Sequence, residues 1–246
     1  MTGQIPEDEL EIELRPAPEV GRRMILLSAL LERTATRDDA RVAADEKDAA
    51  AFDLREWLRH EGLWPLLSPE EAELLASDES PRMLPEQLAE GFMAEALAAL
   101  AWSAGMVNGL DATRPADLGP LIPAIPHPWD STTTWLAALS LRPFGAVAEQ
   151  RERCELWAWR FAIERDLTGP DPIERAELAG ILRETEGAGT AAGLLPAGGF
   201  RVNGGSISAL DAPTRDALAE ANLSRLYALN WVCGFGASWE DVPLDI

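Results

Sequence analysis

The residues that could do chemistry in this chain are arginines, carboxylates and tryptophans, and the arginines of interest are Arg142, Arg160 and Arg225. Arginine makes bidentate pairs with carboxylates, and aromatic neighbours keep such pairs away from water. These residue types predict either an internal ion-pair network or a pocket in which an arginine holds an anionic ligand and a carboxylate acts on it. The other candidates for ligand contacts are Glu95, Asn230, Trp231, Trp239, Asp241 and Asp245.

The network is the simpler of these two interpretations, because structural networks perturb charged groups as readily as active sites do. In the network, the acids after Trp239, including Glu240, pair with arginines and dock the C-terminal tail onto the helices. In the pocket, tryptophans line a cavity for a small molecule. The sequence does not show the geometry that would decide between them.

Sequence motifs of catalysis and cofactor binding do not appear in the chain. The stretch Gly187-Ala-Gly-Thr-Ala-Ala-Gly193 imitates a dinucleotide-binding loop, but its last glycine is one residue late and a predicted helix precedes it. The two histidines, His60 and His127, lie far apart in the sequence, and no close cysteine pair could bind zinc. We therefore predict no catalytic residue, no metal site and no cofactor.

The charge balance narrows the classes of partner. The chain has 42 acidic residues against 21 lysines and arginines, which gives a net charge of −21. A charge of this sign argues against binding to nucleic acid or to an anionic membrane surface. It is compatible with a basic protein partner, and the arginines are compatible with a small anionic ligand. The sequence leaves the oligomeric state open.

Two hypotheses about function follow from these observations. The first is a non-enzymatic binding or protein-interaction module, for example an acidic, immunity-like inhibitor of a basic protein. The alternative is a small-molecule hydrolase or lyase that uses an arginine and carboxylate pocket lined by tryptophan. The missing nucleophile, metal and phosphate-loop motifs favour the first hypothesis.

The two cysteines and the N-terminus predict a cytoplasmic protein. Cys154 and Cys233 both lie in apolar helical patterns, so we interpret them as reduced thiols of the core. The N-terminus lacks the basic and apolar regions of a signal peptide. The longest uncharged run, Ala96–Leu110, is too short to span a membrane. Twenty arginines against one lysine are typical of a GC-rich bacterial genome.

Hydrophobic periodicity and capping residues predict a mainly α fold of about eight helices in a single domain over residues 19–246. Residues 1–18 are acidic and are predicted to be a flexible tail. A small hairpin is expected near residues 199–208, around Asn203-Gly204. The predicted helices cover residues 19–34, 38–61, 85–107, 129–139, 144–166, 171–185 and 211–233, and one more begins at the capping box Ser68-Pro-Glu-Glu71.

The helix predicted over residues 85–107 carries an unusual charge. Glu95 is the lone charged residue between Gly91 and Leu110. A carboxylate in an apolar helix is either paired or has a raised pKa. We therefore expect Glu95 to pair with an arginine from a neighbouring helix.

Two stretches near the C-terminus carry a resemblance to a known family. They read Arg225-Leu-Tyr-Ala-Leu-Asn-Trp231 and Trp239-Glu-Asp-Val242, and Asp245 follows them. This pattern is similar to the closing signature of domain-of-unknown-function family 4272. Family members usually have Glu where this chain has Ser224, a histidine that this chain lacks, and Thr where this chain ends in Ile246.

Other segments are similar to the same family, so the resemblance spans most of residues 20–246. They are Glu95–Gly105, Leu141-Arg142 and Trp157–Arg160. The resemblance implies a shared fold. It implies no reaction, because the family has no established activity.

Overall fold

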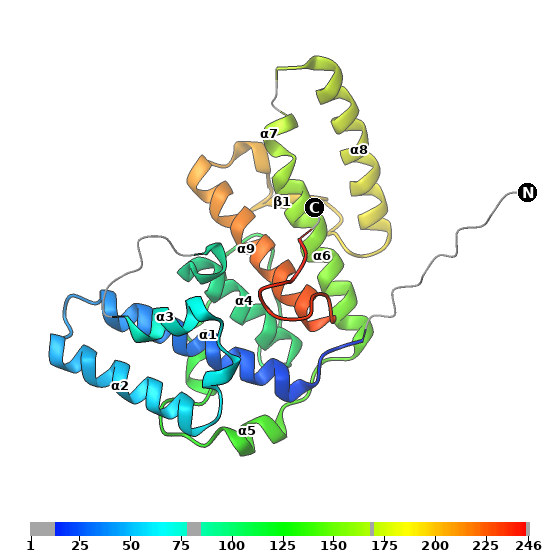
Figure 1. Ribbon diagram of the computed structural model, residues 1–246. Coiled ribbons are helices and arrows are strands. Elements are labelled where there is room, and N and C mark those ends of the chain that lie inside the picture. Colours follow the sequence, from blue (N-terminus) through cyan, green and yellow to red (C-terminus); the bar gives the residue numbers. More distant parts are fainter. Residues whose placement is uncertain (1–12, 78–84, 168–169, 245–246) are drawn as a thin grey trace, which may run out of the picture.

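The computed structural model describes residues 13–77, 85–167 and 170–244, and most of them are helical (Figure 1). The predicted fold class, mainly α with about eight helices and one small hairpin, is confirmed. The longer helices are α1 (Ala17–Asp38), α2 (Ala44–His60), α4 (Glu90–Ser103), α6 (Phe144–Ala162), α8 (Pro172–Ala191) and α9 (Ala212–Val232). The shorter helices are α3 (Pro69–Ala76), α5 (Thr132–Ala138) and α7 (Glu164–Leu167).

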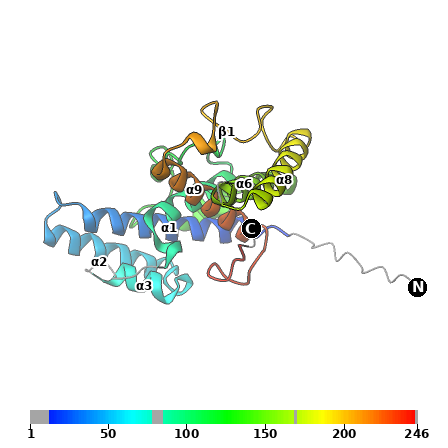
Figure 2. The same cartoon turned by 90° about the horizontal axis from the view of Figure 1, so that it is seen from above.

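Helices α4 and α9 form the centre of the molecule. They pack on each other, α1 covers the other side of α4, and α6 covers the other side of α9. Figure 2 shows α1, α2 and α3 on one side of this centre and α6, α8 and the hairpin on the other. Every α4 residue from Phe92 to Ser103 is buried except the half-buried Ala94, because this helix has neighbours all round.

Some helix starts follow the expected capping residues and others do not. The capping box of Ser68 and Glu71 is present at the start of α3, and Asp211 caps α9 as predicted. Helix α2 begins at Ala44 instead of residue 38 or 39, because Asp39 ends α1 in an extended conformation. Helix α4 ends at Ser103, since Gly105 adopts a left-handed φ of 73°.

The start of the glycine-rich region after residue 186 is helical, which differs from the prediction. Helix α8 continues to Ala191 instead of ending near residue 185. Packing leaves no room for a side chain at Gly189, because a Cβ at this position would lie 2.9 Å from Leu195 Cδ1. The predicted hairpin is confirmed: β1 (Arg201–Val202) pairs antiparallel with β2 (Gly205–Ser206).

The predicted tail over residues 1–18 needs a correction in its last part. Residues 1–12 lie outside the described residues. Residues 13–18 are held against the body, because the Arg15 backbone N–H donates to Val232 O at 2.9 Å and α1 already begins at Ala17. None of the helices in the described ranges is long and apolar enough to cross a membrane.

Candidate functional site

The predicted arginines, carboxylates and tryptophans do not form one cluster. The most buried part is an ion pair between helices α9 and α4, in which Arg225 Nη2 lies 2.6 Å from Glu95 Oε2. Arg225 also donates to Asp111 O at 2.8 Å and to Arg114 O at 2.9 Å. The expected pairing of Glu95 with an arginine of a neighbouring helix is therefore confirmed, and the pair fixes the loop that follows α4.

Two other predicted arginines have local roles at separate places. Arg160 Nη1 donates to Glu164 Oε2 at 2.6 Å, and both side chains are buried where α6 meets α7. Arg142 donates to Trp102 O at 2.7 Å and to Val107 O at 2.9 Å, and its guanidinium lies over the Trp102 ring. Arg142 thus ties the end of α4 to the loop that follows it.

The remaining predicted residues belong to the C-terminal segment, residues 234–244, or to the end of α9 beneath it. Asn230 donates to Pro243 O at 2.9 Å, and Tyr227 Oη donates to Trp239 O. The Trp231 and Trp239 rings meet edge to face with centroids 5.3 Å apart. Asp241 is exposed and accepts a hydrogen bond from Ser238, and Asp245 lies outside the described residues.

A pocket lies between the C-terminal segment and helix α1. We call it the Trp pocket. It has a volume of about 400 Å³. Its walls include the rings of Trp231 and Trp239 and the apolar side chains Leu26 and Leu66. The charged residues that line it are three arginines and two carboxylates: Arg15, Arg22, Arg23, Glu19 and Glu240.

Arg23 is the central charged group of the Trp pocket. Only 4% of it is exposed, and both its Nη atoms donate to the Glu71 carboxylate, one of them at 3.1 Å. Glu71 is held in turn by the Ser68 backbone N–H at 2.9 Å, as part of the capping box of α3. The guanidinium of Arg23 lies 4.3 Å from the centroid of the Trp239 ring, so the ring stacks on a fixed cation.

Two buried N–H donors at the Trp pocket have no acceptor among the described residues. They are Arg23 Nε and Trp239 Nε1. Both side chains line the pocket, and only 6% of Trp239 is exposed. Buried donors are normally paired, so these two N–H groups are the candidates for contact with an acceptor on a ligand.

The other two arginines of the Trp pocket, Arg15 and Arg22, differ in whether their guanidinium groups already have partners. Arg15 donates to Trp231 O at 2.8 Å, to Gly236 O at 2.7 Å and to Glu19 at 2.7 Å, and its guanidinium lies over the Trp231 ring. Arg22 is exposed and has no ion pair among the described residues. The Trp pocket therefore has one arginine that fixes the C-terminal segment and one that is available to a ligand.

The Tyr227 hydroxyl and the two cysteine thiols are protonated at neutral pH. Burial raises the pKa of the Tyr227 hydroxyl to about 12. Burial also raises the pKa of the Cys154 and Cys233 thiols to about 11. A nucleophile needs a lowered pKa or an adjacent base, so these groups suit packing and hydrogen bonding and not attack on a substrate.

Sequence reasoning missed the arginines of the Trp pocket and Glu71, the partner of Arg23. One signal was present for Arg23, which stands three residues after Val20 and four before Leu27. This spacing places it on the apolar stripe of a helix, where a charge requires a partner. The partner itself, Glu71, was recognised as a capping residue only.

Comparison with known proteins gives one match. A family model described as "Domain of unknown function (DUF4272)" matches residues 4–171, more than half of the chain. The stretches that suggested the resemblance at the C-terminus lie after the matched residues. Neither the curated proteins nor the solved structures provide a match.

Proposed function

The chain belongs to the family described as domain of unknown function DUF4272, and we propose that it is a non-enzymatic binding module whose Trp pocket takes a small organic anion. The observation that carries this proposal is the pair of buried donors, Arg23 Nε and Trp239 Nε1, without acceptors among the described residues. A buried donor left without a partner costs about 1–3 kcal/mol. An anionic oxygen supplies the strongest acceptor for both.

The walls of the Trp pocket indicate what kind of body carries the anionic group of the ligand. Leu26 and the Trp231 ring offer apolar surface, so the anionic group is attached to an apolar body. Arg22 supplies a positive charge without a counter-ion among the described residues. A carboxylate on a flat or branched hydrocarbon body meets all three requirements.

Benzoate is a suitable probe, because it carries a carboxylate on a flat hydrocarbon ring. We expect benzoate to bind, measured by ligand-observed NMR, and Arg22→Gln to weaken its binding about tenfold, as expected for a lost hydrogen bond to a charged group. Arg215→Gln is the matched control, because Arg215 is also on the surface but far along α9 from the pocket, outside its lining. Trp239→Phe keeps an aromatic ring at this position and removes the indole N–H donor, so it also weakens benzoate binding.

Two results would overturn the proposal. One is benzoate affinity that Arg22→Gln and Arg215→Gln change equally. The other is native mass spectrometry of the protein isolated from its own cells that shows a bare chain, together with no benzoate binding. A small anion that co-purifies with the parent protein and not with Arg22→Gln supports the proposal and gives the mass of the ligand.

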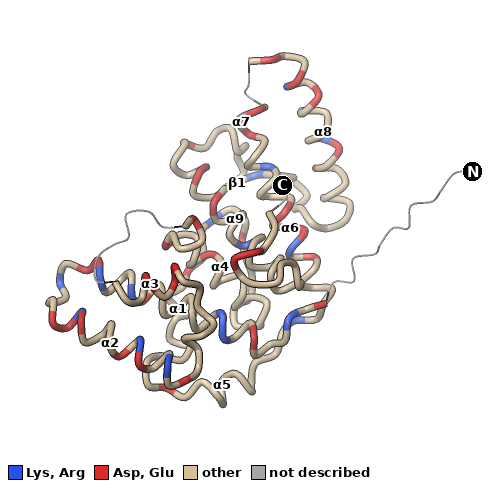
Figure 3. The backbone as a smooth tube through the Cα atoms, viewed as in Figure 1, with Lys and Arg blue, Asp and Glu red and all other residues tan. Residues whose placement is uncertain are grey.

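A second candidate is binding of a basic protein, and one observation favours it. Several arginines point inward, among them Arg23, Arg160 and Arg225, whereas carboxylates line the exposed sides of α2 and α8 (Figure 3). Each of these three arginines forms a neutral pair with a buried carboxylate, so the rest of the chain carries the whole net charge of −21. An acidic surface attracts a basic partner by long-range steering and complementary charge.

The test of this second candidate uses the exposed acids of α2. Replacing Asp45, Glu46 and Asp48 by their amides leaves the core unchanged, because all three side chains are exposed. We expect a basic partner, captured from the native cells, to be lost in this variant and released from the parent by high salt. Capture that is equal in both proteins and insensitive to salt contradicts the idea. The hydrolase or lyase alternative and the cytoplasmic location stay predictions.

A further inference from the structure

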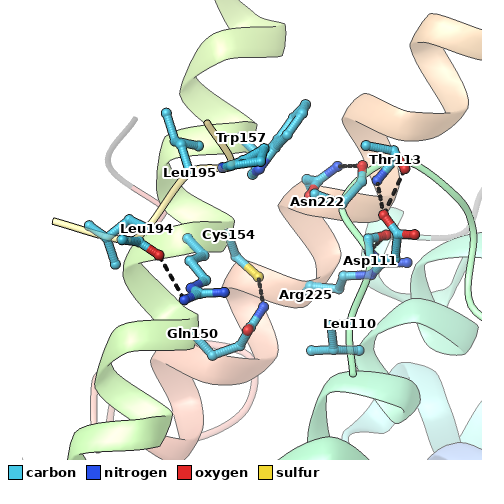
Figure 4. Close-up of a pocket in the computed structure, with 14 residues that line it drawn as sticks. Leu110, Asp111, Thr113, Gln150, Cys154, Trp157, Leu194, Leu195, Asn222 and Arg225 are labelled. Atoms are coloured by element: carbon cyan, nitrogen blue, oxygen red, sulfur yellow. Dashed lines mark hydrogen bonds between the residues drawn. The ribbon is translucent and has the colours of Figure 1, made fainter. Parts of the chain in front are cut away.

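A second pocket lies on the opposite side of α9 from the Trp pocket, between α9, α6 and two loops. We call it the Asn222 pocket. It has a volume of about 310 Å³, which is in the range of small-molecule sites. Figure 4 shows Trp157 and Cys154 of α6 facing Asn222 and Arg225 of α9 across it, with the loop around Asp111 on one side.

Asn222 is the polar group that marks this pocket as a site. It is fully buried, and its Nδ2 donates to Ala112 O at 3.0 Å and to Leu218 O at 2.8 Å. These two carbonyl partners fix the orientation of the amide, because a flipped amide would direct its oxygen at two acceptors. Asn222 Oδ1 has no donor among the described residues, although the side chain lines the pocket.

The charged groups of the wall are already neutralised. Arg225 is paired with Glu95, Arg153 with Glu149, and Asp111 with Arg114. Each side-chain nitrogen of Arg225 donates to Glu95 or to a backbone carbonyl group. A ligand with a net charge would therefore meet no free counter-ion on these walls, and its desolvation would be uncompensated.

Arg153 contributes a second unsatisfied group, which is a hydrogen-bond donor. Its Nε is buried and has no acceptor among the described residues, while one Nη donates to Gly193 O at 2.9 Å. Both side chains line the pocket, so its walls include a residue of α9 with an unpartnered acceptor and a residue of α6 with an unpartnered donor. Leu110, Leu195 and Trp157 supply the apolar surface between them.

We infer that the Asn222 pocket is a second, independent binding site, for an uncharged small molecule that carries a carboxamide or an equivalent donor and acceptor on an apolar body. The ligand N–H donates to Asn222 Oδ1, and its carbonyl oxygen accepts from Arg153 Nε. The proposal does not depend on the organic anion of the Trp pocket.

The two cysteines give a test with an internal control. Cys154 lines the Asn222 pocket, and Cys233 does not, yet burial raises the pKa of both thiols to about 11. The intact chain is treated with methyl methanethiosulfonate at pH 9, with and without benzamide, and the labelling of each cysteine is followed by peptide mass spectrometry. We expect benzamide to slow the labelling of Cys154 at least threefold and to leave Cys233 unchanged. Benzoate, which carries a charge, does not protect Cys154.

Variants of the pocket wall complete the test. Asn222→Ala removes the acceptor and abolishes the protection of Cys154 by benzamide. This change also removes the two hydrogen bonds of Asn222 Nδ2 and so destabilises the fold. Ala112→Phe is therefore the second variant, because it fills the pocket from a half-buried loop position. Protection that survives Ala112→Phe, protection of both cysteines alike, or no protection of Cys154 by benzamide at its solubility limit overturns the inference.

Discussion

The ion pair between Arg225 and Glu95 allows a quantitative prediction about stability. The perturbation is Glu95→Gln, which keeps the shape of the side chain and removes its charge. Arg225 is 1% exposed, so after the change a buried guanidinium has lost its counter-ion. Two carbonyl groups, Asp111 O and Arg114 O, still accept from it.

The magnitude follows from the geometry. An N–O distance of 2.6 Å places the two charge centres about 4 Å apart, where the attraction is about 4 kcal/mol at an effective dielectric constant of about 20. Breaking a buried pair by removing one partner typically costs about 3–5 kcal/mol. Because the two carbonyl groups retain part of the stabilisation, we expect a loss of about 3 kcal/mol in the free energy of unfolding.

The assay is urea unfolding followed by tryptophan fluorescence, with thermal unfolding as a second measure. A loss of about 3 kcal/mol lowers Tm by about 6–12 °C in a chain of this size. The matched control is Glu149→Gln, which breaks a pair whose carboxylate side chain is 52% exposed and which should cost less than about 1 kcal/mol.

A double variant tests the cause of the loss. Glu95→Leu together with Arg225→Met removes both charges, so we expect it to be more stable than Glu95→Gln, since no uncompensated charge stays buried. The reasoning is refuted if Glu95→Gln and Glu149→Gln have the same stability within about 1 kcal/mol, or if the double variant is the least stable of the three.

Three further predictions concern the C-terminal segment and the thiols. Asn230→Ala removes the bond to Pro243 O, so hydrogen exchange should become faster in residues 236–244 while the overall loss of stability stays near 1–2 kcal/mol. Gly236→Ala should weaken benzoate binding as well as stability, because its φ is 80° and an added Cβ would lie 2.8 Å from a backbone oxygen of the same segment; equal affinity in both proteins would contradict this. For Cys154 and Cys233, the folded pKa of about 11 exceeds the ordinary value of 9.0, so the folded state holds protons that the unfolded state has lost between these pH values. Stability should fall there by about 1.4 kcal/mol per pH unit for each thiol, and a variant with alanine at both positions should show a shallower slope in urea titrations at pH 8 to 11.

Much of the local structure follows from the sequence alone. Ser68 and Glu71 predict the start of a helix, and Asn203-Gly204 predicts a hairpin. The apolar run around Glu95 predicts a buried helix. Each of these patterns depends only on residues that are close in the chain. The buried position of Glu95 even predicts an arginine partner. The membership of the family was also predicted from short stretches of sequence.

The tertiary structure alone decided which residues share a site. The sequence grouped Arg142, Arg160 and Arg225 by their type, but each is held by carbonyl groups or carboxylates of its own surroundings. Arg23 and Trp239 are separated by more than two hundred residues in the sequence. They stack because the C-terminal segment packs against α1. Partners of this kind depend on how helices pack, and no spacing within one helix encodes that.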